Sequence, residues 1–211
     1  TRSLSIIKSD DIIQREESFP CGVLSRVASS HIRIGTFEYF NYRKDINSLK
    51  LLADYTINRH FPSIKRTKNK YQQLLIKVQS INAELVAKWM AVGFIHGVMN
   101  TDNTSISGET IDYGPCAFMD YYDPNKVYSY IDHQGRYSYI NQGKIMFWNL
   151  SKFAESLIPI LDKDSEFARN IAVDVLKDFP RIFEGKWLDK MREKFGFSSK
   201  FKNDYKIISE F

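Results

Sequence analysis

Apolar residues recur at steps of three and four positions through much of the chain, a pattern typical of helices that bury one face. The predicted helices span about residues 47–61, 71–92, 145–161, 165–179 and 187–195. Pro62 follows the first helix and Gly93 follows the second, and both residues end helices readily. The body of the protein is therefore expected to be helical, with the long second helix ending just before His96.

The first part of the chain has shorter apolar runs that predict extended segments. These segments are Leu4–Ile7, Ile12–Arg15 after a turn at Ser9–Asp11, and Val23–Val27 after a break at Pro20 and Gly22. Strands and helices together predict an α+β fold that is mostly α. Since 43% of the 211 residues are hydrophobic, one sizeable core can form, and a single domain over residues 1–211 is expected.

The stretch from His96 to Pro115, called the site loop below, concentrates the candidate chemistry of the chain. It holds a histidine, three glycines, and the candidate metal or proton ligands Asp102, Asn103 and Asp112. These polar residues do not follow the spacing of an amphipathic surface. A functional site is therefore predicted here.

Two spacings in the site loop are those of protein kinases. His96 and Asn103 are seven residues apart, as in the catalytic loop H-R-D-L-x-x-x-N, and Asp112-Tyr113-Gly114 is similar to D-F-G. Val98 occupies the position of the kinase base and cannot accept a proton. Two oxygen ligands for Mg²⁺ or Mn²⁺ remain, whereas ordinary kinase chemistry is disfavoured.

Between these ligands, residues 105–107 and 109–111 predict two short strands that turn at Gly108 and bring Asp112 beside Asn103. A short β-hairpin would then carry the metal site. The alternative is a polar hairpin in which Asp102 and Asn103 only cap a turn.

Arg26 and Arg33 are the candidate phosphate ligands outside the loop. On residue type alone, surface arginines or arginines paired with carboxylates are the favoured interpretation. His31, which lies between them, is interpreted as structural.

Longer motifs extend these spacings. They are S-R-V-A-S-S-H-I-R-I-G-T-F from Ser25, G-F-I-H-G-V-M-N-T-D-N from Gly93, T-I-D-Y-G-P from Thr110, D-H-Q-G-R-Y from Asp132 and W-N-L from Trp148. The sequence from Thr1 to about Pro159 closely resembles the selenoprotein O family, which comprises pseudokinases that act as protein adenylyltransferases.

The resemblance implies a kinase-like C-terminal lobe, with the glycine-rich loop and phosphate-binding lysine of the N-terminal lobe lying before the position matching Thr1. It implies transfer of AMP from ATP to Ser, Thr or Tyr hydroxyls of proteins, with the α-phosphorus facing the acceptor and UTP as an alternative donor. Asn103 and Asp112 would bind Mg²⁺ or Mn²⁺, Asp112, Arg26 and Arg33 would bind the nucleotide, and Asp102 would be the catalytic base. The alternatives are a non-catalytic nucleotide-binding or scaffold protein and a true protein kinase.

Charge, hydropathy and cysteine content bear on the possible partners of the chain and on its compartment. The net charge of +5 is mild, and the basic run 65–70 is interpreted as a solvated loop, so no nucleic-acid partner is expected. No apolar run approaches the roughly 20 residues that span a bilayer, so no membrane partner is expected. Cys21 and Cys116 lack metal-type spacing, and free thiols in a cytoplasmic protein are predicted.

Overall fold

The computed structural model describes residues 1–197, 199–201 and 203–209, and within them the fold is α+β and mostly helical, as the sequence predicted. The helices are α1 (Ile34–Tyr42), α2 (Ile46–His60), α3 (Lys70–Ala91), α4 (Gln142–Leu161), α5 (Ser165–Lys177), α6 (Phe179–Phe195) and α7 (Asp204–Ser209). The strands are β1 (Arg2–Gln14), β2 (Ser18–Val27), β3 (Phe94–Ile95) and β4 (Ala117–Phe118). Single turns of 3₁₀ helix are η1 (Pro62–Ile64), η2 (Thr101–Asn103) and η3 (Tyr139–Asn141).

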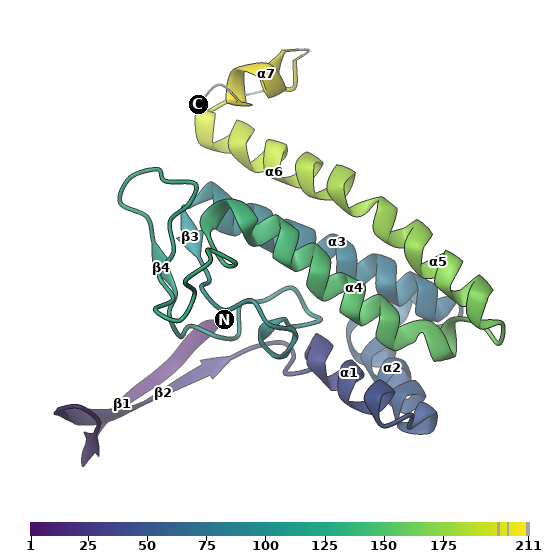
Figure 1. The fold of residues 1–211 in the computed structure, drawn as a ribbon, viewed down its shortest axis with the longest axis horizontal. Coiled ribbons are helices and arrows are strands. Elements are labelled where there is room, and N and C mark those ends of the chain that lie inside the picture. The colour runs from purple at the N-terminus through teal and green to yellow at the C-terminus, as the bar shows by residue number, and fades with distance from the viewer. Residues whose placement is uncertain (198, 202, 210–211) are drawn as a thin grey trace.

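Helices α3 and α4 lie side by side at the centre of the helical body (Figure 1). Helices α1 and α2 cover one end of the pair, and α5 and α6 pack along it on the other side. The core is apolar and closely packed: the Phe37 ring of α1 meets the Phe153 ring of α4 edge to face, with centroids 4.9 Å apart. This body gives the site loop a fixed support, because the loop begins five residues after α3 ends and reaches its end before α4 begins.

The predicted helices agree with α2, α3, α4 and α5 to within a few residues at each end. Helix α6 begins at Phe179, well before the predicted start at Trp187. Helix α1 was not predicted. It has only nine residues and buries only Ile34 and Phe37 fully, so its apolar period is too short to identify from the sequence.

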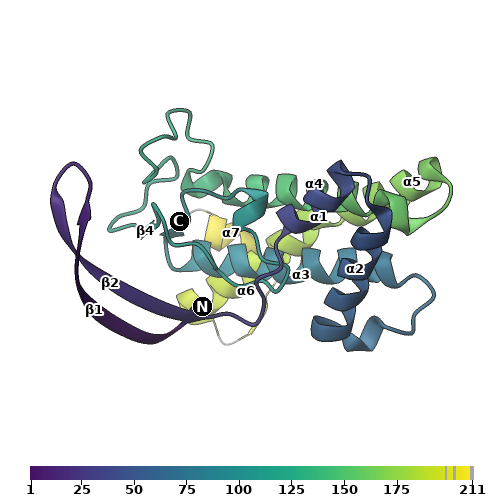
Figure 2. The ribbon, with the colours of Figure 1, turned by 90° about the horizontal axis from the view of Figure 1, so that it is seen from below.

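The N-terminal segments form one long antiparallel hairpin of β1 and β2 that projects from the helical body (Figure 2). The predicted turn at Ser9–Asp11 is wrong: the ladder continues past it with a register shift between Lys8 and Ile12. The predicted break at Pro20 and Gly22 is also wrong, since both residues lie within β2. In a two-stranded sheet every strand is an edge strand, so a proline can direct its N atom away from the ladder.

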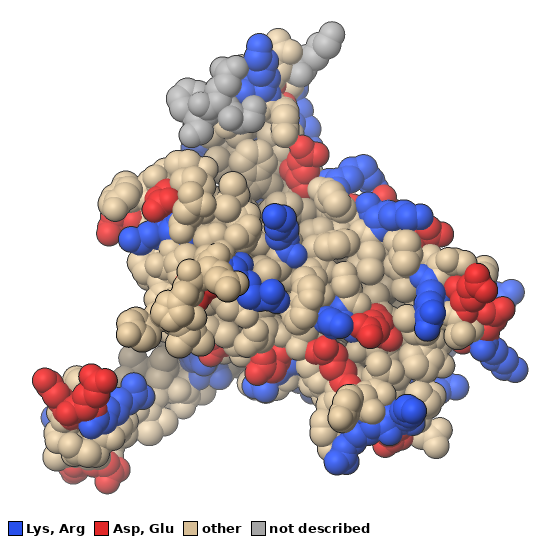
Figure 3. Space-filling model, viewed as in Figure 1, with Lys and Arg blue, Asp and Glu red and all other residues tan. Residues whose placement is uncertain are grey.

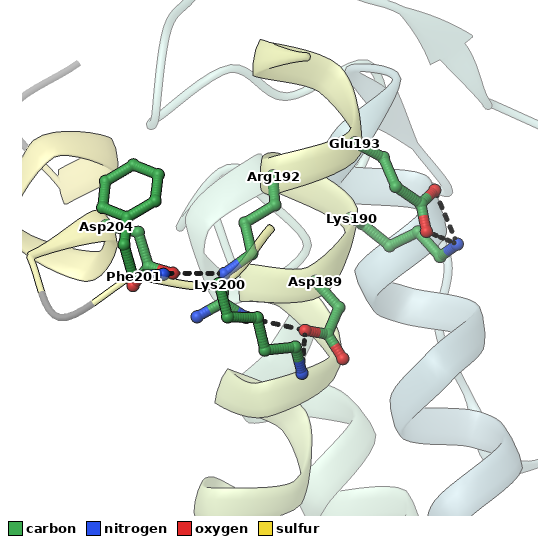
Figure 4. A network of polar contacts seen from close by, with 7 residues as sticks. All are labelled: Asp189, Lys190, Arg192, Glu193, Lys200, Phe201 and Asp204. Carbon is green, nitrogen blue, oxygen red and sulfur yellow. Dashed lines mark hydrogen bonds and ion pairs between the residues drawn. The ribbon is translucent and has the colours of Figure 1, made fainter. Parts of the chain in front are cut away.

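Helix α7 is fastened to α6 by a small ionic network (Figure 4). Arg192 Nε lies 2.5 Å from Asp204 Oδ2, and Arg192 Nη1 lies 2.6 Å from Asp189 Oδ1. Lys200 Nζ also contacts Asp189 Oδ1, at 2.9 Å. Asp204 thus links α7 to α6 through the guanidinium of Arg192.

Charged side chains of both signs are interspersed over the face drawn in Figure 3. Of the basic run 65–70, Lys70 pairs with Asp54 at 2.6 Å, and Lys65–Asn69 form a loop before α3. Cys21 and Cys116 are both free, as predicted. None of the helices in the described residues is long and apolar enough to cross a membrane.

Candidate functional site

The site loop is fixed to α4 where it begins. The amide of Gln142, in the first turn of α4, is fully buried and bonds the backbone on both sides of Ile95: its Oε1 accepts from His96 N at 3.1 Å, and its Nε2 donates to Phe94 O at 3.0 Å. Because both amide atoms are used without access to water, the path of the chain into the loop is well determined.

A second buried amide of α4 holds the middle of the loop. Asn149 Nδ2 donates to Met99 O at 3.0 Å and to Thr104 Oγ1 at 2.8 Å. From the opposite side, Asn82 of α3 donates to Ser105 O at 3.3 Å. Turn η2, which contains Asp102 and Asn103, is therefore held on both sides by hydrogen bonds from α3 and α4.

Within the loop, two oxygen donors remain available to a ligand. Asn103 Nδ2 donates to Val98 O at 3.0 Å, while Asn103 Oδ1 accepts no hydrogen bond within the described chain. The Asp112 carboxylate accepts only a long hydrogen bond, from Gly114 N at 3.4 Å. Both side chains are partly buried, so their oxygens lie at the surface of the loop rather than in its core.

The two ends of the site loop come together at Gly97. This residue has φ +84°, and a Cβ placed on it would lie only 2.8 Å from Pro115 O. Farther along, Gly108 (φ +69°) turns the chain against Ile81 of α3, as the sequence predicted. Any larger residue at Gly97 would push the segment after Asp112 away from the start of the loop.

The predicted hairpin of residues 105–107 and 109–111 is wrong in one respect. The loop does reverse at Gly108, but it is closed by a single antiparallel bridge between Thr104 and Thr110 instead of two strands. The backbone of residues 104–106 bonds elsewhere: Ile34 N donates to Thr104 O at 3.0 Å, and Ile106 N donates to Ile32 O at 3.1 Å. The chain leading into α1 has taken the place of the expected partner strand.

That pairing brings the two candidate arginines to the site loop. Arg33 bridges Ser105, two residues after Asn103, and its side chain is exposed. Arg26 Nη1 donates to Ile111 O at 2.8 Å, and its guanidinium lies 4.7 Å from the centroid of the Tyr113 ring. Both arginines therefore lie next to the loop that holds Asn103 and Asp112.

Asp102, in η2, packs against the first turn of α1. A Cβ added to Gly35, in the first turn of that helix, would be 3.3 Å from both Asp102 Cα and Asp102 N. Its side chain is exposed and has no hydrogen-bond partner in the described residues. Asp102 is thus free to contact a molecule bound at the loop.

His96 is interior rather than a ligand. It is fully buried beside Trp89 and Phe94, its Nδ1 accepts from Val98 N at 3.4 Å, and its Nε2 has no partner within the described chain. Burial lowers the pKa of His96 below the usual 6.5 of histidine, although the Asp112 carboxylate acts in the opposite direction. The imidazole is accordingly neutral in the folded protein at pH 7.

The neutral state of His96 predicts a pH-dependent stability. Below pH 6.5 the unfolded chain binds a proton at this histidine and the folded chain does not, so the free energy of unfolding decreases as the pH falls, by at most about 1.4 kcal/mol per pH unit. In His96→Asn, urea unfolding at about pH 7.5 and about pH 5.5 should give a smaller difference than in the wild type. An undiminished difference in His96→Asn would contradict the assignment.

The donor set fits Mg²⁺ or Mn²⁺ better than zinc. No group of three or more His, Cys, Asp and Glu side chains that could hold a metal occurs in the described residues. Asn103 Oδ1 and the Asp112 carboxylate are hard oxygen donors, and ions such as Mg²⁺ take few protein ligands and complete their shell with phosphate oxygens and water.

Gln142, Asn149 and Asn82 are the functional supports that sequence reasoning missed. A signal for them exists: each is a polar residue on the apolar face of a helix, beside core residues such as Met146 and Leu150. A buried amide on such a face must find partners, and here its partners are the backbone of the site loop.

Comparisons with known proteins identify the family of the chain. Residues 1–211 match the family described as protein adenylyltransferase SelO. The chain is 51% identical over 208 residues to the protein nucleotidyltransferase YdiU of Agrobacterium fabrum, covering 99% of this chain and 43% of that protein. It is 52% identical over 208 residues to the YdiU of Brevibacillus brevis (99% of this chain, 42% of that protein) and 52% identical over 210 residues to that of Bacillus thuringiensis subsp. konkukian (100% and 43%).

The chain thus spans less than half the length of these curated relatives. The similarity nevertheless covers the arginine segment, the site loop and the helices that support it. The match extends from the first residue to the last, and the chain belongs to the SelO family of protein adenylyltransferases.

Proposed function

We propose that this chain forms the metal- and phosphate-binding part of a kinase-like protein nucleotidyltransferase that moves AMP from ATP to a hydroxyl group of a protein. The observation that supports the proposal is the pairing of residues 32–34 with residues 104–106, together with the hydrogen bond from Arg26 to Ile111 O, since both connect the arginine segment to the loop that contains Asn103 and Asp112. Cations beside metal-ligand oxygens form a suitable site for a nucleoside triphosphate and its metal. The names of the relatives support nucleotidyl transfer as the reaction class.

Each residue has a defined role in this proposal. Asn103 Oδ1 and the Asp112 carboxylate would hold Mg²⁺ or Mn²⁺, which when bound would supply positive charge to the phosphates. Arg26 and Arg33 bind the β- and γ-phosphates and stabilise the pyrophosphate as it leaves. With its Nη1 on Ile111 O, Arg26 is held by the loop while its other N–H groups remain available.

The transfer step is a displacement at the α-phosphorus. The acceptor hydroxyl oxygen forms a bond to the α-phosphorus, the bond from that phosphorus to the oxygen bridging to the β-phosphorus breaks, and pyrophosphate leaves. The hydroxyl proton goes to the Asp102 carboxylate. Asp102 suits this role because it is exposed, unpaired in the described residues, and adjacent to Asn103. Val98 occupies the position of the base in ordinary kinases, so the base must come from another residue.

An affinity measurement tests the phosphate role of the arginines. Arg33→Gln should weaken ATP binding in the presence of Mn²⁺ by about 10- to 100-fold, because a charged hydrogen bond to phosphate contributes about 1.5–3 kcal/mol. Binding of adenosine, which has no phosphate, should not change. Calorimetric titration of the 211-residue chain gives both values, and Arg181→Gln, an exposed arginine of α6 paired with Asp178, is the matched control. Equal losses for ATP and adenosine would argue against phosphate contact.

A further inference from the structure

Glu109 joins the site loop to the segment that carries the arginines. Its Oε2 accepts hydrogen bonds from Ser29 N at 2.8 Å, from the Ser29 hydroxyl, and from Ser107 Oγ at 2.9 Å. Ser29 and Glu109 are 80 residues apart in sequence. A single carboxylate oxygen with three donors is a strong, charge-assisted anchor.

Ser29 occupies a critical position in that segment. It lies three residues after Arg26 and four before Arg33, in the connection between β2 and α1. Its carbonyl accepts from Arg59 Nη2 of α2 at 3.3 Å, so the residue is held from two sides. Besides the Glu109 contact, the backbone pairing at residues 32–34 and the Arg26 side chain hold this segment to the site loop.

The protonation state of Glu109 suits a carboxylate that accepts three hydrogen bonds. Partial burial raises the pKa of its carboxyl, but the hydrogen bonds from Ser29 and Ser107 outweigh this effect, and the net pKa lies below the usual 4.5. The carboxylate is therefore ionised at neutral pH and accepts all three hydrogen bonds. Because its Oε2 is engaged by Ser29 and Ser107, we infer that it acts through these residues.

We propose that Glu109 is a positioning residue, which sets the separation of Arg26 and Arg33 from Asn103 and Asp112 and thereby tunes affinity for the triphosphate rather than for the nucleoside. The inference rests on the proposed function for its consequence, although not for its geometry. The proposal gives a role to Ser29, Ser107 and Glu109, which take no part in the proposed binding of metal and phosphate.

Hydrogen exchange tests the geometry without any ligand. In Glu109→Ala, the Ser29 amide should exchange faster because it loses its acceptor. The Ile34 and Ile106 amides should also exchange faster, although their acceptors are backbone carbonyls and not Glu109. We expect acceleration of about tenfold or more at those two amides, as one charged anchor is lost, and no change in the interior of α3. Glu109→Gln, whose amide oxygen can accept the same donors, should recover most of the protection. Unchanged exchange at Ile34 and Ile106 would reduce Glu109 to a local contact and overturn the proposal.

A double-mutant cycle tests the consequence. Glu109→Ala should weaken ATP binding with Mn²⁺ by about 10- to 100-fold and leave adenosine binding unchanged. In a chain that already carries Arg26→Ala and Arg33→Ala, the same substitution should have less than about a twofold effect, because no arginine remains to be positioned. Glu155→Ala, an exposed glutamate of α4 paired with Lys152, is the control in both backgrounds. Additive losses would overturn the proposal. If the wild-type chain bound no ATP, the proposed function would fail, and the exchange result alone would decide the positioning claim.

Discussion

Replacement of Asp112 by alanine is expected to abolish nucleotidyl transfer, with a loss of about a thousandfold or more in rate. The expectation follows from the proposed metal site: a divalent ion held there would stabilise the phosphates by several kcal/mol, and each 1.4 kcal/mol corresponds to about tenfold in rate. Asp112 is the only carboxylate in the proposed pair of metal ligands; Asn103, the other ligand, is neutral. The amide of Asn103 cannot replace that charge.

The measurement is the initial rate at which label from ATP labelled at the α-phosphorus appears on protein, at several Mn²⁺ concentrations. Asp174→Ala, an exposed carboxylate of α5 paired with Lys177, removes an equal charge far from the loop in sequence and should retain the wild-type rate. Folding of both variants is compared by thermal unfolding. Retention of Mn²⁺-dependent transfer in Asp112→Ala would remove this residue from the metal site.

Asp102→Asn is expected to lower the rate of transfer by about 100- to 10,000-fold, the usual range for loss of a general base. Asparagine has nearly the same shape as aspartate but cannot accept the proton of the attacking hydroxyl. The Asp102 side chain is exposed and makes no hydrogen bond in the described residues, so the substitution should leave the folded structure intact. ATP affinity should therefore remain at the wild-type value while turnover falls.

A calorimetric titration with ATP and a single-turnover assay separate the two effects. Asp120→Asn, another exposed aspartate in the segment after the site loop, is the matched control. If Asp102→Asn transferred AMP at the wild-type rate, the base would have to be sought elsewhere. If ATP affinity fell in parallel with the rate, Asp102 would be a ligand of the nucleotide or its metal instead.

The helices that support the site could be predicted because their apolar residues repeat locally. Helix α3, for example, buries Leu74, Val78 and Val86 on one face, and that repeat is visible in the sequence. The hairpin of β1 and β2 was harder to predict: its strands are mostly exposed, so their length is determined by the ladder between them and not by a buried face. Pro20 and Gly22, which usually interrupt strands, are tolerated there for the same reason.

The residues that pair with the site loop could not be predicted from the sequence. The interpretation of the loop as a site, from the spacing of His96 and Asn103 and the triplet at Asp112, stays a prediction. No local pattern indicates that residues 104–106 pair with residues 32–34, more than 70 positions earlier, instead of with residues 109–111. Such long-range pairings are chosen by the whole fold, here by α1 docking on α4, and they are what bring Arg33 beside Asn103.

The hydrogen-bond partners of the buried amides could not be predicted from the sequence either. Gln142 and Asn149 lie seven residues apart on α4, and the apolar pattern around them identifies a helix whatever their partners are. Their hydrogen bonds to Phe94, His96 and Met99 depend on how α4 packs against the end of α3. Sequence reasoning can flag a polar residue on a core face, whereas its partners follow only from the tertiary structure.

The central claim is that this site transfers a nucleotidyl group. The most direct test incubates the chain and a mixture of acceptor proteins with Mn²⁺ and ATP labelled at the α-phosphorus or, in a parallel sample, at the γ-phosphorus. Covalent α-label on protein, with no γ-label, is the predicted result. Covalent γ-label would mean that the site works as a kinase, and the absence of both labels would mean that this chain does not carry out the transfer; either result would contradict the claim.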